Sequence, residues 1–292
     1  MESLSFKKMH GSGNDFILID NREGKIRDSQ GPDLAALLCR RKFGVGADGL
    51  ILIENSHMAD FKWRFFNADG SKAEMCGNGG RCAARFACMT GIGPRKLSFE
   101  TKAGIIHADV RGSAVKLQLP QPKDLKLDVP VNIYGETLIL HCLNTNVPHT
   151  VYFTPDLESV PIFEWGRLIR FDSCFQPAGT NANFVQVFDR HNILIRTYER
   201  GVENETMACG TGAVASAILS ACKDMTESPV KVKTRGGEVL TVYFHLDGQE
   251  VRDVFLEGET VLVYSGRIER DDSAEKTQSA ALLQFSSHCD IR

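Results

Sequence analysis

A short motif occurs twice in this chain of 292 residues, and the repeat constrains the fold more than any other feature. It reads Met-Cys-Gly-Asn-Gly-Gly at residues 75–80 and Ala-Cys-Gly-Thr-Gly-Ala at residues 208–213. In both copies an apolar segment follows, and a Thr-basic-small-Gly tetrapeptide ends 28 residues after the cysteine, from 76 to 104 and from 209 to 237. Shared offsets of this kind indicate duplicated structural units. We therefore expect two similar domains related by a pseudo-twofold axis.

Strand-like segments outnumber helical ones along the chain. Runs rich in β-branched and aromatic residues, bounded by Gly, Asn or Asp, predict strands at residues 16–20, 50–54, 61–66, 114–119, 184–188, 193–198, 230–234 and 239–244. Helices are predicted at residues 33–41, 79–90, part of 156–170, and 210–223. Since strict βαβ alternation is absent, the pattern predicts an α+β (mixed α/β) fold with mixed sheets. The helix through 213–221 carries no charge, so we expect it to be buried at the centre of its domain.

The repeat also suggests where the domains begin and end. We expect an N-terminal domain over residues 1–121, completed by about 264–270, and a C-terminal domain over 122–263. The crossing between them is placed at residues 121–124. Residues 271–292 form a polar tail, in which 280–285 could make a short helix.

Each repeated cysteine lies at the start of a predicted helix. The glycines after Cys76 and Cys209 leave backbone N–H groups that have no partner within the helix. Such a turn attracts a carboxylate, and it is expected to stabilise the thiolate and lower the pKa of the thiol. If the two domains face one cleft, two thiols lie on opposite sides of one ligand. That arrangement suits inversion of a stereocentre, in which a base removes the α-proton from one face and an acid returns it on the other.

Other readings of the cysteines stay open at this point. A single cysteine beside a glycine-rich turn is more often a buried packing residue, as in a carboxylate-binding module without activity. A thiol oxidoreductase or a cysteine hydrolase would use only one reactive cysteine. The nine cysteines are odd in number and include no CxxC pair, so neither a disulfide framework nor a zinc site is indicated.

Composition narrows the partners. The net charge of −3 and the pI near 6.3 do not favour nucleic acid or an anionic membrane as a partner. No apolar run approaches the roughly 20 residues that span a bilayer, and the first residues lack a secretory pattern. The expected compartment is the cytoplasm.

Six stretches, taken together and in order, resemble a known family. They are residues 8–16, 66–71, 75–79, 180–184, 198–201 and 208–212. Over about residues 6–266 the chain closely resembles the diaminopimelate epimerase family. The resemblance implies two α/β domains, each a curled mixed sheet around a central helix. It also implies an isomerase that needs no pyridoxal phosphate or other cofactor and no metal, that interconverts LL- and meso-diaminopimelate in lysine and peptidoglycan-precursor synthesis, and that forms a homodimer.

The resemblance also implies roles for the matching positions. Cys76 and Cys209 are the implied acid/base pair, and His149 and Glu199 are implied neighbours that adjust the pKa values of the thiols. An asparagine can read both an ammonium and a carboxylate, and an arginine can hold a carboxylate with two parallel hydrogen bonds. The implied substrate-binding residues are Asn14, Asn67, Gly77, Asn78, Asn181, Glu199, Arg200, Gly210 and Thr211.

Two positions depart from the family pattern. Gly49 stands where many members have glutamine, and Val147 stands where many have asparagine. Both positions are expected to read the distal end of diaminopimelate, and neither side chain here can make a directed hydrogen bond. The alternative function is therefore an amino-acid racemase on the same fold with a broader or different substrate, such as glutamate or proline.

Overall fold

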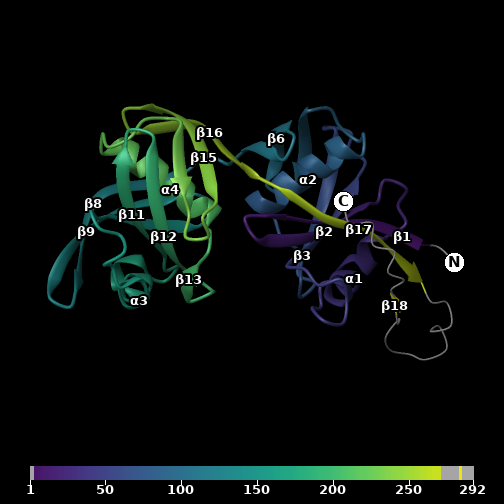
Figure 1. Ribbon diagram of the computed structural model, residues 1–292, viewed down its shortest axis with the longest axis horizontal. Coiled ribbons are helices and arrows are strands. Elements are labelled where there is room, and N and C mark those ends of the chain that lie inside the picture. Colours follow the sequence, from purple (N-terminus) through teal and green to yellow (C-terminus); the bar gives the residue numbers. More distant parts are fainter. Residues whose placement is uncertain (1–2, 271–282, 285–292) are drawn as a thin grey trace. The chain divides into compact units, whose positions relative to one another are not determined.

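The chain divides into two compact units in the computed structural model, which describes residues 3–270 and 283–284 (Figure 1). Unit 1 comprises the described residues up to Val115 and those from Glu259 onward, and unit 2 comprises Lys116–Gly258. The boundaries fall a few residues before the positions expected from the sequence, 121/122 and 263/264. Of the predicted tail, only residues 283–284 lie within the part that the structure describes.

Unit 1 contains one mixed sheet in the order β17-β1-β2-β3-β4-β5-β6. From β1 to β6 the neighbouring strands pair antiparallel, parallel, antiparallel, parallel and antiparallel. Helix α1 follows β2, and helix α2 follows β4. The bounds are β1 Ser3–Gly11, β2 Asn14–Asp20, η1 Asp28–Gln30, α1 Gly31–Leu38, β3 Gly49–Glu54, β4 Phe61–Asn67, α2 Gly77–Met89, β5 Lys96–Thr101, β6 Gly104–Arg111, β7 Ala114–Gln118, β17 Val261–Arg270 and β18 Leu283–Gln284.

Unit 2 repeats this topology. From β9 to β15, in the order β9-β10-β11-β12-β14-β15, the pairings are again antiparallel, parallel, antiparallel, parallel and antiparallel. Helix α3 lies between β10 and β11, and α4 lies between β12 and β14, as α1 and α2 do in unit 1. The bounds are β8 Lys123–Ile133, β9 Glu136–Asn144, β10 Pro148–Phe153, α3 Ile162–Phe171, η2 Ser173–Phe175, β11 Asn181–Asp189, β12 Asn192–Glu199, β13 Asn204–Thr206, α4 Gly210–Cys222, β14 Val230–Lys233, β15 Val239–Asp247 and β16 Glu250–Glu259.

The predicted α+β class is confirmed, and the predicted strands and helices between residues 16 and 244 are present within a few residues of their expected bounds. Two predictions are wrong. The crossing was expected at residues 121–124, but the chain passes between the units at 115/116, and strand β8 already begins at Lys123. The sequence pattern did not predict β8, because polar residues alternate with its apolar ones. Residues 283–284, placed in a short helix, form strand β18, which pairs with the end of β17. The rest of that predicted helix lies outside the described residues.

The helices that begin at the repeated motif lie at the centre of their units (Figure 1). Residues 212–221 of α4 are all buried, as the absence of charge predicted. Small residues such as Ala213 and Ala217 let the surrounding strands approach α4 closely, and valines and isoleucines of those strands complete the core. Helix α2 is equally enclosed, although it buries the guanidinium of Arg81.

A helical glycine touches an aromatic ring at corresponding places in both units. A Cβ on Gly31 of α1 would overlap the ring of Phe66, and one on Gly166 of α3 would overlap Tyr198. We predict that Gly166→Ala lowers the free energy of unfolding by about 1–3 kcal/mol, because the overlap outweighs the helix propensity that alanine gains. Thermal unfolding should show a melting temperature lower by several degrees. Arg167→Ala, on the exposed side of α3, is the control and should leave it unchanged.

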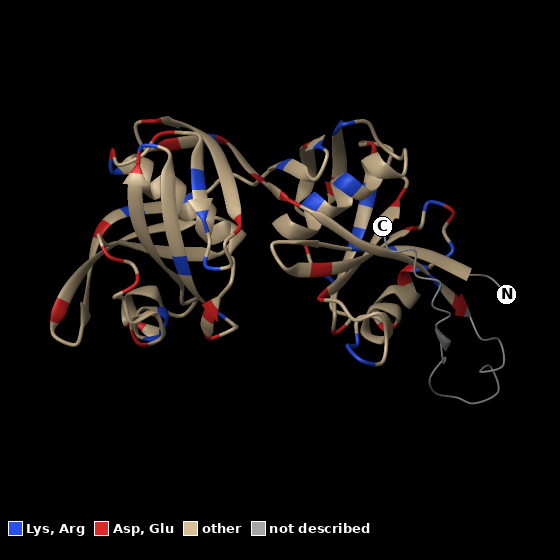
Figure 2. Ribbon diagram, viewed as in Figure 1, with Lys and Arg blue, Asp and Glu red and all other residues tan. Residues whose placement is uncertain are grey.

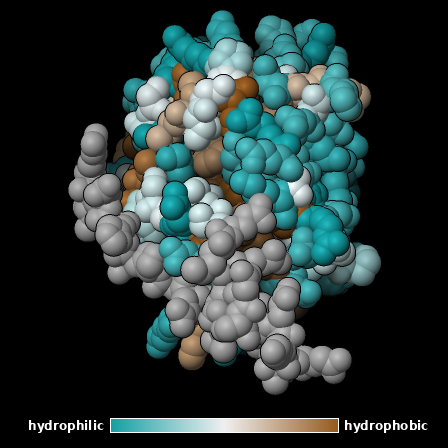
Figure 3. Space-filling view, turned by 90° about the vertical axis from the view of Figure 1, so that its right-hand side faces the viewer, coloured by the Kyte–Doolittle hydropathy of each residue, from teal (hydrophilic) through white to brown (hydrophobic). Residues whose placement is uncertain are grey.

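The surface is mixed in character. Figure 2 shows basic and acidic residues interspersed over each unit, without a large area of one sign. On the face drawn in Figure 3, hydrophilic residues predominate among those coloured. Among the described residues, no helix has both the length and the hydropathy needed to cross a membrane.

Candidate functional site

The sulfur of Cys76 is held at the start of α2. Cys76 is the N-cap residue, with an extended backbone (φ −145°), and its Sγ accepts the N–H of Gly79 at 3.4 Å. The N–H groups of the first helical turn therefore converge on the sulfur. A negative charge on this atom, or on a carboxylate beside it, would be stabilised by these donors.

Asparagine side chains link Cys76 to the hairpin between β1 and β2. The thiol of Cys76 donates to Asn14 Oδ1 at 3.5 Å, and Asn78 Nδ2 donates to the same oxygen at 3.5 Å. Asn14 Nδ2 in turn donates to Asp48 Oδ2 at 2.7 Å. The structure therefore brings together three of the predicted site residues, Cys76, Asn14 and Asn78. Asp48 is a further member that the sequence reasoning missed.

Arg81 supports this cluster from within α2. Its side chain is fully buried, and Nη2 donates to Asn78 Oδ1 at 2.9 Å and to Ser12 Oγ at 2.8 Å. One guanidinium thus fixes both the helix start and the β1–β2 turn. The sequence contains a signal for it, because Arg81 is a charged residue within the predicted helix, directly after the repeated motif.

Asn67 lies at the end of β4 and faces solvent. Its Nδ2 donates to Ser71 Oγ at 2.9 Å, and its N–H donates to Ser71 O at 2.9 Å. Among the described residues, no hydrogen bond joins Asn67 to Cys76. The Asn67 side chain keeps a free acceptor edge, which is compatible with the predicted binding role.

Cys209 is the N-cap residue of α4, as Cys76 is of α2, but its side chain accepts no capping hydrogen bond. Its Sγ lies 3.5 Å from Thr211 Oγ1, and Thr145 Oγ1 donates to Thr211 O at 3.1 Å. A Cβ on Gly212 would overlap Asn183 Oδ1 and come within 3.3 Å of Cys209 Sγ. Only glycine leaves room here for the sulfur and the amide together.

His149 is buried beneath this helix start and connects to it through Asn183. Asn183 Nδ2 lies 3.1 Å from His149 Nδ1, and Asn183 Oδ1 accepts the hydroxyl of Thr197 at 2.9 Å. Burial, together with the positive charge of Arg200, lowers the pKa of His149 to about 3, so the ring is neutral. Nδ1 then accepts from Asn183, and the proton resides on Nε2, which has no hydrogen-bond partner within residues 3–270. Asn183 is a second residue that the sequence reasoning did not single out.

Asn181 is committed to holding the backbone around this site. Its Oδ1 accepts the N–H of Arg200 at 2.8 Å, and its Nδ2 donates to Pro148 O at 3.1 Å. Arg200 Nη1 donates to Ala178 O at 2.8 Å. No ion pair between Glu199 and Arg200 occurs among the described residues. The two side chains are therefore separate charged groups.

The predicted lowering of the thiol pKa values is wrong for the structure as it stands. Burial raises the pKa of Cys76, against the opposing hydrogen bonds from the N–H groups of Gly79 and Asn78. Burial and then the charge of Glu199 raise the pKa of Cys209 to about 11, and the nearby polar groups of Thr211 and Gly212 oppose this rise only in part. Desolvation of the thiolate outweighs the helix N-terminus in both cases. The pKa of Glu199 is itself raised by burial. Of the two predicted modulators, Glu199 acts on Cys209, whereas His149 is not among the groups that set its pKa.

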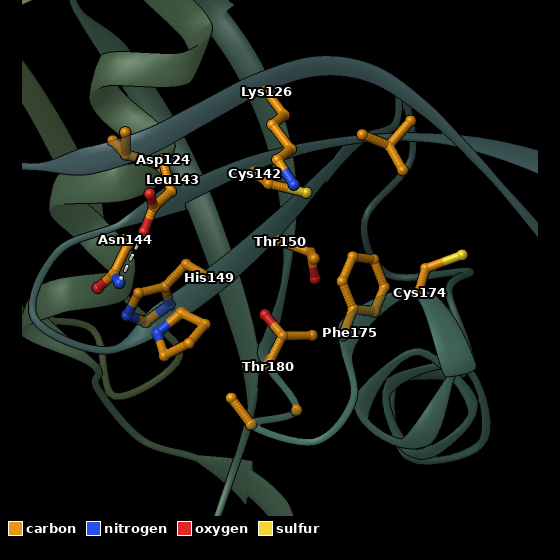
Figure 4. Close-up of a pocket in the computed structure, with 14 residues that line it drawn as sticks. Asp124, Lys126, Cys142, Leu143, Asn144, His149, Thr150, Cys174, Phe175 and Thr180 are labelled. Atoms are coloured by element: carbon orange, nitrogen blue, oxygen red, sulfur yellow. Dashed lines mark hydrogen bonds between the residues drawn. The ribbon is translucent and has the colours of Figure 1, made fainter.

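A pocket of about 170 Å³ opens on the other side of His149 within unit 2 (Figure 4). The thiols of Cys142 and Cys174 line it together with Asn144 and Thr150, and neither Cys209 nor Glu199 does. Burial raises the pKa of Cys142 to about 11, and a hydrogen bond with Asp172 raises that of Cys174. Both thiols of this pocket are therefore protonated at neutral pH, which does not favour cysteine hydrolase chemistry there.

The departure at Gly49 has a structural counterpart. A Cβ on Gly49 would lie 2.6 Å from Phe65 Cε2 and 2.8 Å from Phe66 O. The ring of Phe65 thus occupies the space into which a longer residue at position 49 would extend. Val147 lies in the turn before β10, where its carbonyl accepts the N–H of Thr145 at 3.1 Å.

Comparisons with known proteins agree with this geometry. A family model described as diaminopimelate epimerase matches residues 6–120 and 141–263. A diaminopimelate epimerase of Aquifex aeolicus is 48% identical over 279 residues, covering 92% of this chain and 99% of that protein. One of Caldanaerobacter subterraneus is 41% identical, covering 91% of this chain and 100% of that protein.

Solved structures add the fold. A hydroxyproline epimerase of Agrobacterium vitis superposes with a TM-score of 0.66 at 15% identity, covering 93% of this chain and 92% of that one. A PhzF-family protein of Bacillus anthracis gives a TM-score of 0.69 at 14% identity, covering 92% and 100%. At these identities the likeness establishes the shared fold alone, whereas the family match and the relatives extend over nearly the whole chain. With capping cysteines at equivalent places of a duplicated fold, the chain belongs to the diaminopimelate epimerase family.

Proposed function

We propose that this protein interconverts LL- and meso-diaminopimelate by inverting one α-carbon, as an isomerase that uses two thiols. The observation that carries the proposal is the equivalence of Cys76 and Cys209, each the N-cap of the central helix of its unit. A reaction that runs in both directions needs the same kind of group for removal and return of the proton.

In one direction the Cys76 thiolate takes the α-proton and becomes a thiol, while the Cys209 thiol gives its proton to the opposite face of the carbon and becomes a thiolate. In the reverse direction the roles exchange. The electron pair of the broken C–H bond is held on the α-carbon and its carboxylate until the second proton arrives. The N–H groups of Gly77, Asn78 and Thr211 are donors suited to that carboxylate.

The polar residues outside the thiols fit the two ends of the substrate. Diaminopimelate carries two amino-acid groups, so one end needs anchors away from the chemistry. Arg200 offers a guanidinium for a carboxylate, and Asn14, Asn67 and Asn78 offer mixed donors and acceptors for an ammonium and a carboxylate. Asn181 orients Arg200 by accepting its N–H.

The test is incubation with LL-diaminopimelate in deuterated water, without added pyridoxal phosphate or metal. We expect meso-diaminopimelate to appear with deuterium at the inverted α-carbon, detected by chiral chromatography with mass spectrometry. Glutamate and proline serve as parallel substrates, because Gly49 and Phe65 leave an apolar wall where a distal amide is usual. Turnover of either at a rate comparable to diaminopimelate would favour the broader racemase instead. No exchange with any of them would refute the proposal.

The compartment and the assembly remain proposals. We place the protein in the cytoplasm, which is supported by the free thiols of the eight cysteines that the structure describes, since a reducing compartment keeps thiols in that state. We also propose a homodimer, and the partly exposed valines 261 and 263 on β17 are compatible with a covered strand. Light scattering coupled to size-exclusion chromatography measures the mass, and a monomer of about 32.3 kDa would contradict the dimer.

A further inference from the structure

Corresponding arginines occupy the same place in the two units. Arg64 lies on β4 and Arg196 on β12, the third strand counted from the equivalent β2 and β10. Each guanidinium donates to a carbonyl of the segment just before the first helix of its unit, α1 or α3. Arg64 Nη2 donates to Ile26 O at 2.8 Å, and Arg196 Nη1 donates to Leu157 O at 3.3 Å. The two sites can therefore be compared atom by atom.

Unit 2 neutralises its site internally. Arg196 Nε and Nη2 donate to the two carboxylate oxygens of Glu205 at 2.7 Å and 2.8 Å. Arg235, in the second copy of the tetrapeptide repeat, lies 3.8 Å from Glu205 and 3.7 Å from Glu158. Two cations thus face two carboxylates. The Nε and Nη2 donors of Arg196 are therefore both paired with Glu205, in a bidentate geometry.

Unit 1 has the opposite charge at the position of Glu205. Lys72 forms a β-bridge with Phe66, as Glu205 pairs with Tyr198 in unit 2. Lys72 precedes Cys76 by four positions, and Glu205 precedes Cys209 by four. Arg64 Nε is the counterpart of the atom that donates to Glu205. It is buried and has no hydrogen-bond partner among the described residues. A buried charged donor without an acceptor is costly, so this edge of Arg64 is suited to an anion from outside the chain.

Arg64 is one of the residues that line a pocket of about 280 Å³. Four cationic residues and two carboxylates line it: Lys62, Arg64, Lys72 and Lys102 with Asp28 and Glu100. Asp28 already accepts from Arg64 at 3.0 Å and from Lys72 at 3.2 Å, and Glu54 holds the far edge of the guanidinium. Within residues 3–270, neither Lys62 nor Lys102 forms an ion pair. Even with Glu54 counted, the cations are in excess.

We propose that this pocket of unit 1 binds the phosphate group of a small phosphorylated molecule. One phosphate oxygen takes the place of the Glu205 carboxylate and accepts from Arg64 Nε. The flexible Lys72 side chain turns from Asp28 to admit the group, and the ammonium groups of Lys72 and Lys102 contact the remaining oxygens. A phosphate offers three free oxygens to the donors of Arg64, Lys72 and Lys102, whereas a single carboxylate offers two. The volume is about nine times the ~30 Å³ that a water occupies in the liquid, which leaves room for a small organic substituent.

The test measures binding and not epimerisation, so it stands apart from the proposed function. Inorganic phosphate and glycerol phosphate are titrated into the full chain in a phosphate-free buffer, with ³¹P NMR line broadening and calorimetry as readouts. We expect saturable binding of both. Tighter binding of glycerol phosphate would support a phosphate monoester as the ligand, and equal binding would support recognition of the phosphate group alone.

Lys72→Glu rebuilds in unit 1 the arrangement that Arg196 and Glu205 form in unit 2. We expect this variant to fold and to bind phosphate at least about tenfold more weakly, because Arg64 then has an internal acceptor. Lys102→Ala should also weaken binding, without adding a carboxylate. It is the second test of the proposal if Lys72→Glu does not fold. Lys231→Glu makes the same charge change on the exposed face of β14 and should bind as the unmodified protein does. No saturable binding, or equal affinity in Lys72→Glu, would overturn the proposal.

Discussion

Cys76→Ser and Cys209→Ser are each expected to lower the rate of epimerisation by about 10³-fold or more, within the range that a positioned acid or base supplies. A serine hydroxyl has almost the same size but is a far weaker acid than a thiol, so it neither removes nor returns the α-proton at neutral pH. Because the two thiols take opposite parts in the two directions, loss of either stops both. The measurement is inversion of LL- and of meso-diaminopimelate with each variant.

Matched controls come from the same chain. Cys142→Ser and Cys174→Ser change thiols in the unit 2 pocket that lacks Cys209, and both should retain activity within a few fold. The overall folds of the four variants can be compared by circular dichroism and thermal unfolding. Full activity in either Cys76→Ser or Cys209→Ser would leave a mechanism with a single reactive cysteine, and full activity in both would leave the cysteines as packing residues.

Much of the fold could be predicted from local sequence patterns. The uncharged helix 210–222 and the repeated offset of the cysteines predicted a duplicated fold around buried helices, and both units share one order of strand pairings. Strand β8 escaped because its apolar residues alternate with Lys, Asp and Asn and include Pro130. Its partner β9 is the next strand, joined to β8 by the two residues Tyr134 and Gly135, so the hairpin turn was the local signal for this strand.

The sequence predicted Cys76, Asn14 and Asn78 in one site, and the structure brings these three together, but the electrostatics of the site could not be predicted. Glycines after each cysteine indicated free N–H donors, and in unit 1 the N–H of Gly79 donates to the sulfur of Cys76. Burial nevertheless raises both pKa values, because the cost of desolvating a thiolate depends on the packing of the whole unit. For the same reason, Asn183 and Asp48 could not be ranked above other polar residues, since their importance arises from which groups lie beside them.

Arg81 is the residue whose replacement should show this balance most directly. Its buried positive charge lowers the pKa of Cys76 and opposes the larger effect of burial. In Arg81→Met the pKa of Cys76 should rise further, so a smaller fraction of Cys76 is thiolate at neutral pH. We expect kcat/KM at neutral pH to fall by about 10²-fold, through both the lost charge and the lost positioning of Asn78.

The pH profile separates these two effects. Since a raised pKa means that thiolate accumulates only as the pH increases, the rising limb of the rate should move to higher pH in Arg81→Met, and part of the activity should return there. Arg81→Lys keeps the positive charge, so the rising limb of its pH profile should stay near that of the unmodified enzyme. Because lysine lacks the planar guanidinium that reaches both Asn78 and Ser12, kcat of this variant should stay low. A loss of activity in Arg81→Met that is uniform across pH would assign Arg81 a purely structural role, and the electrostatic link to Cys76 would then be wrong.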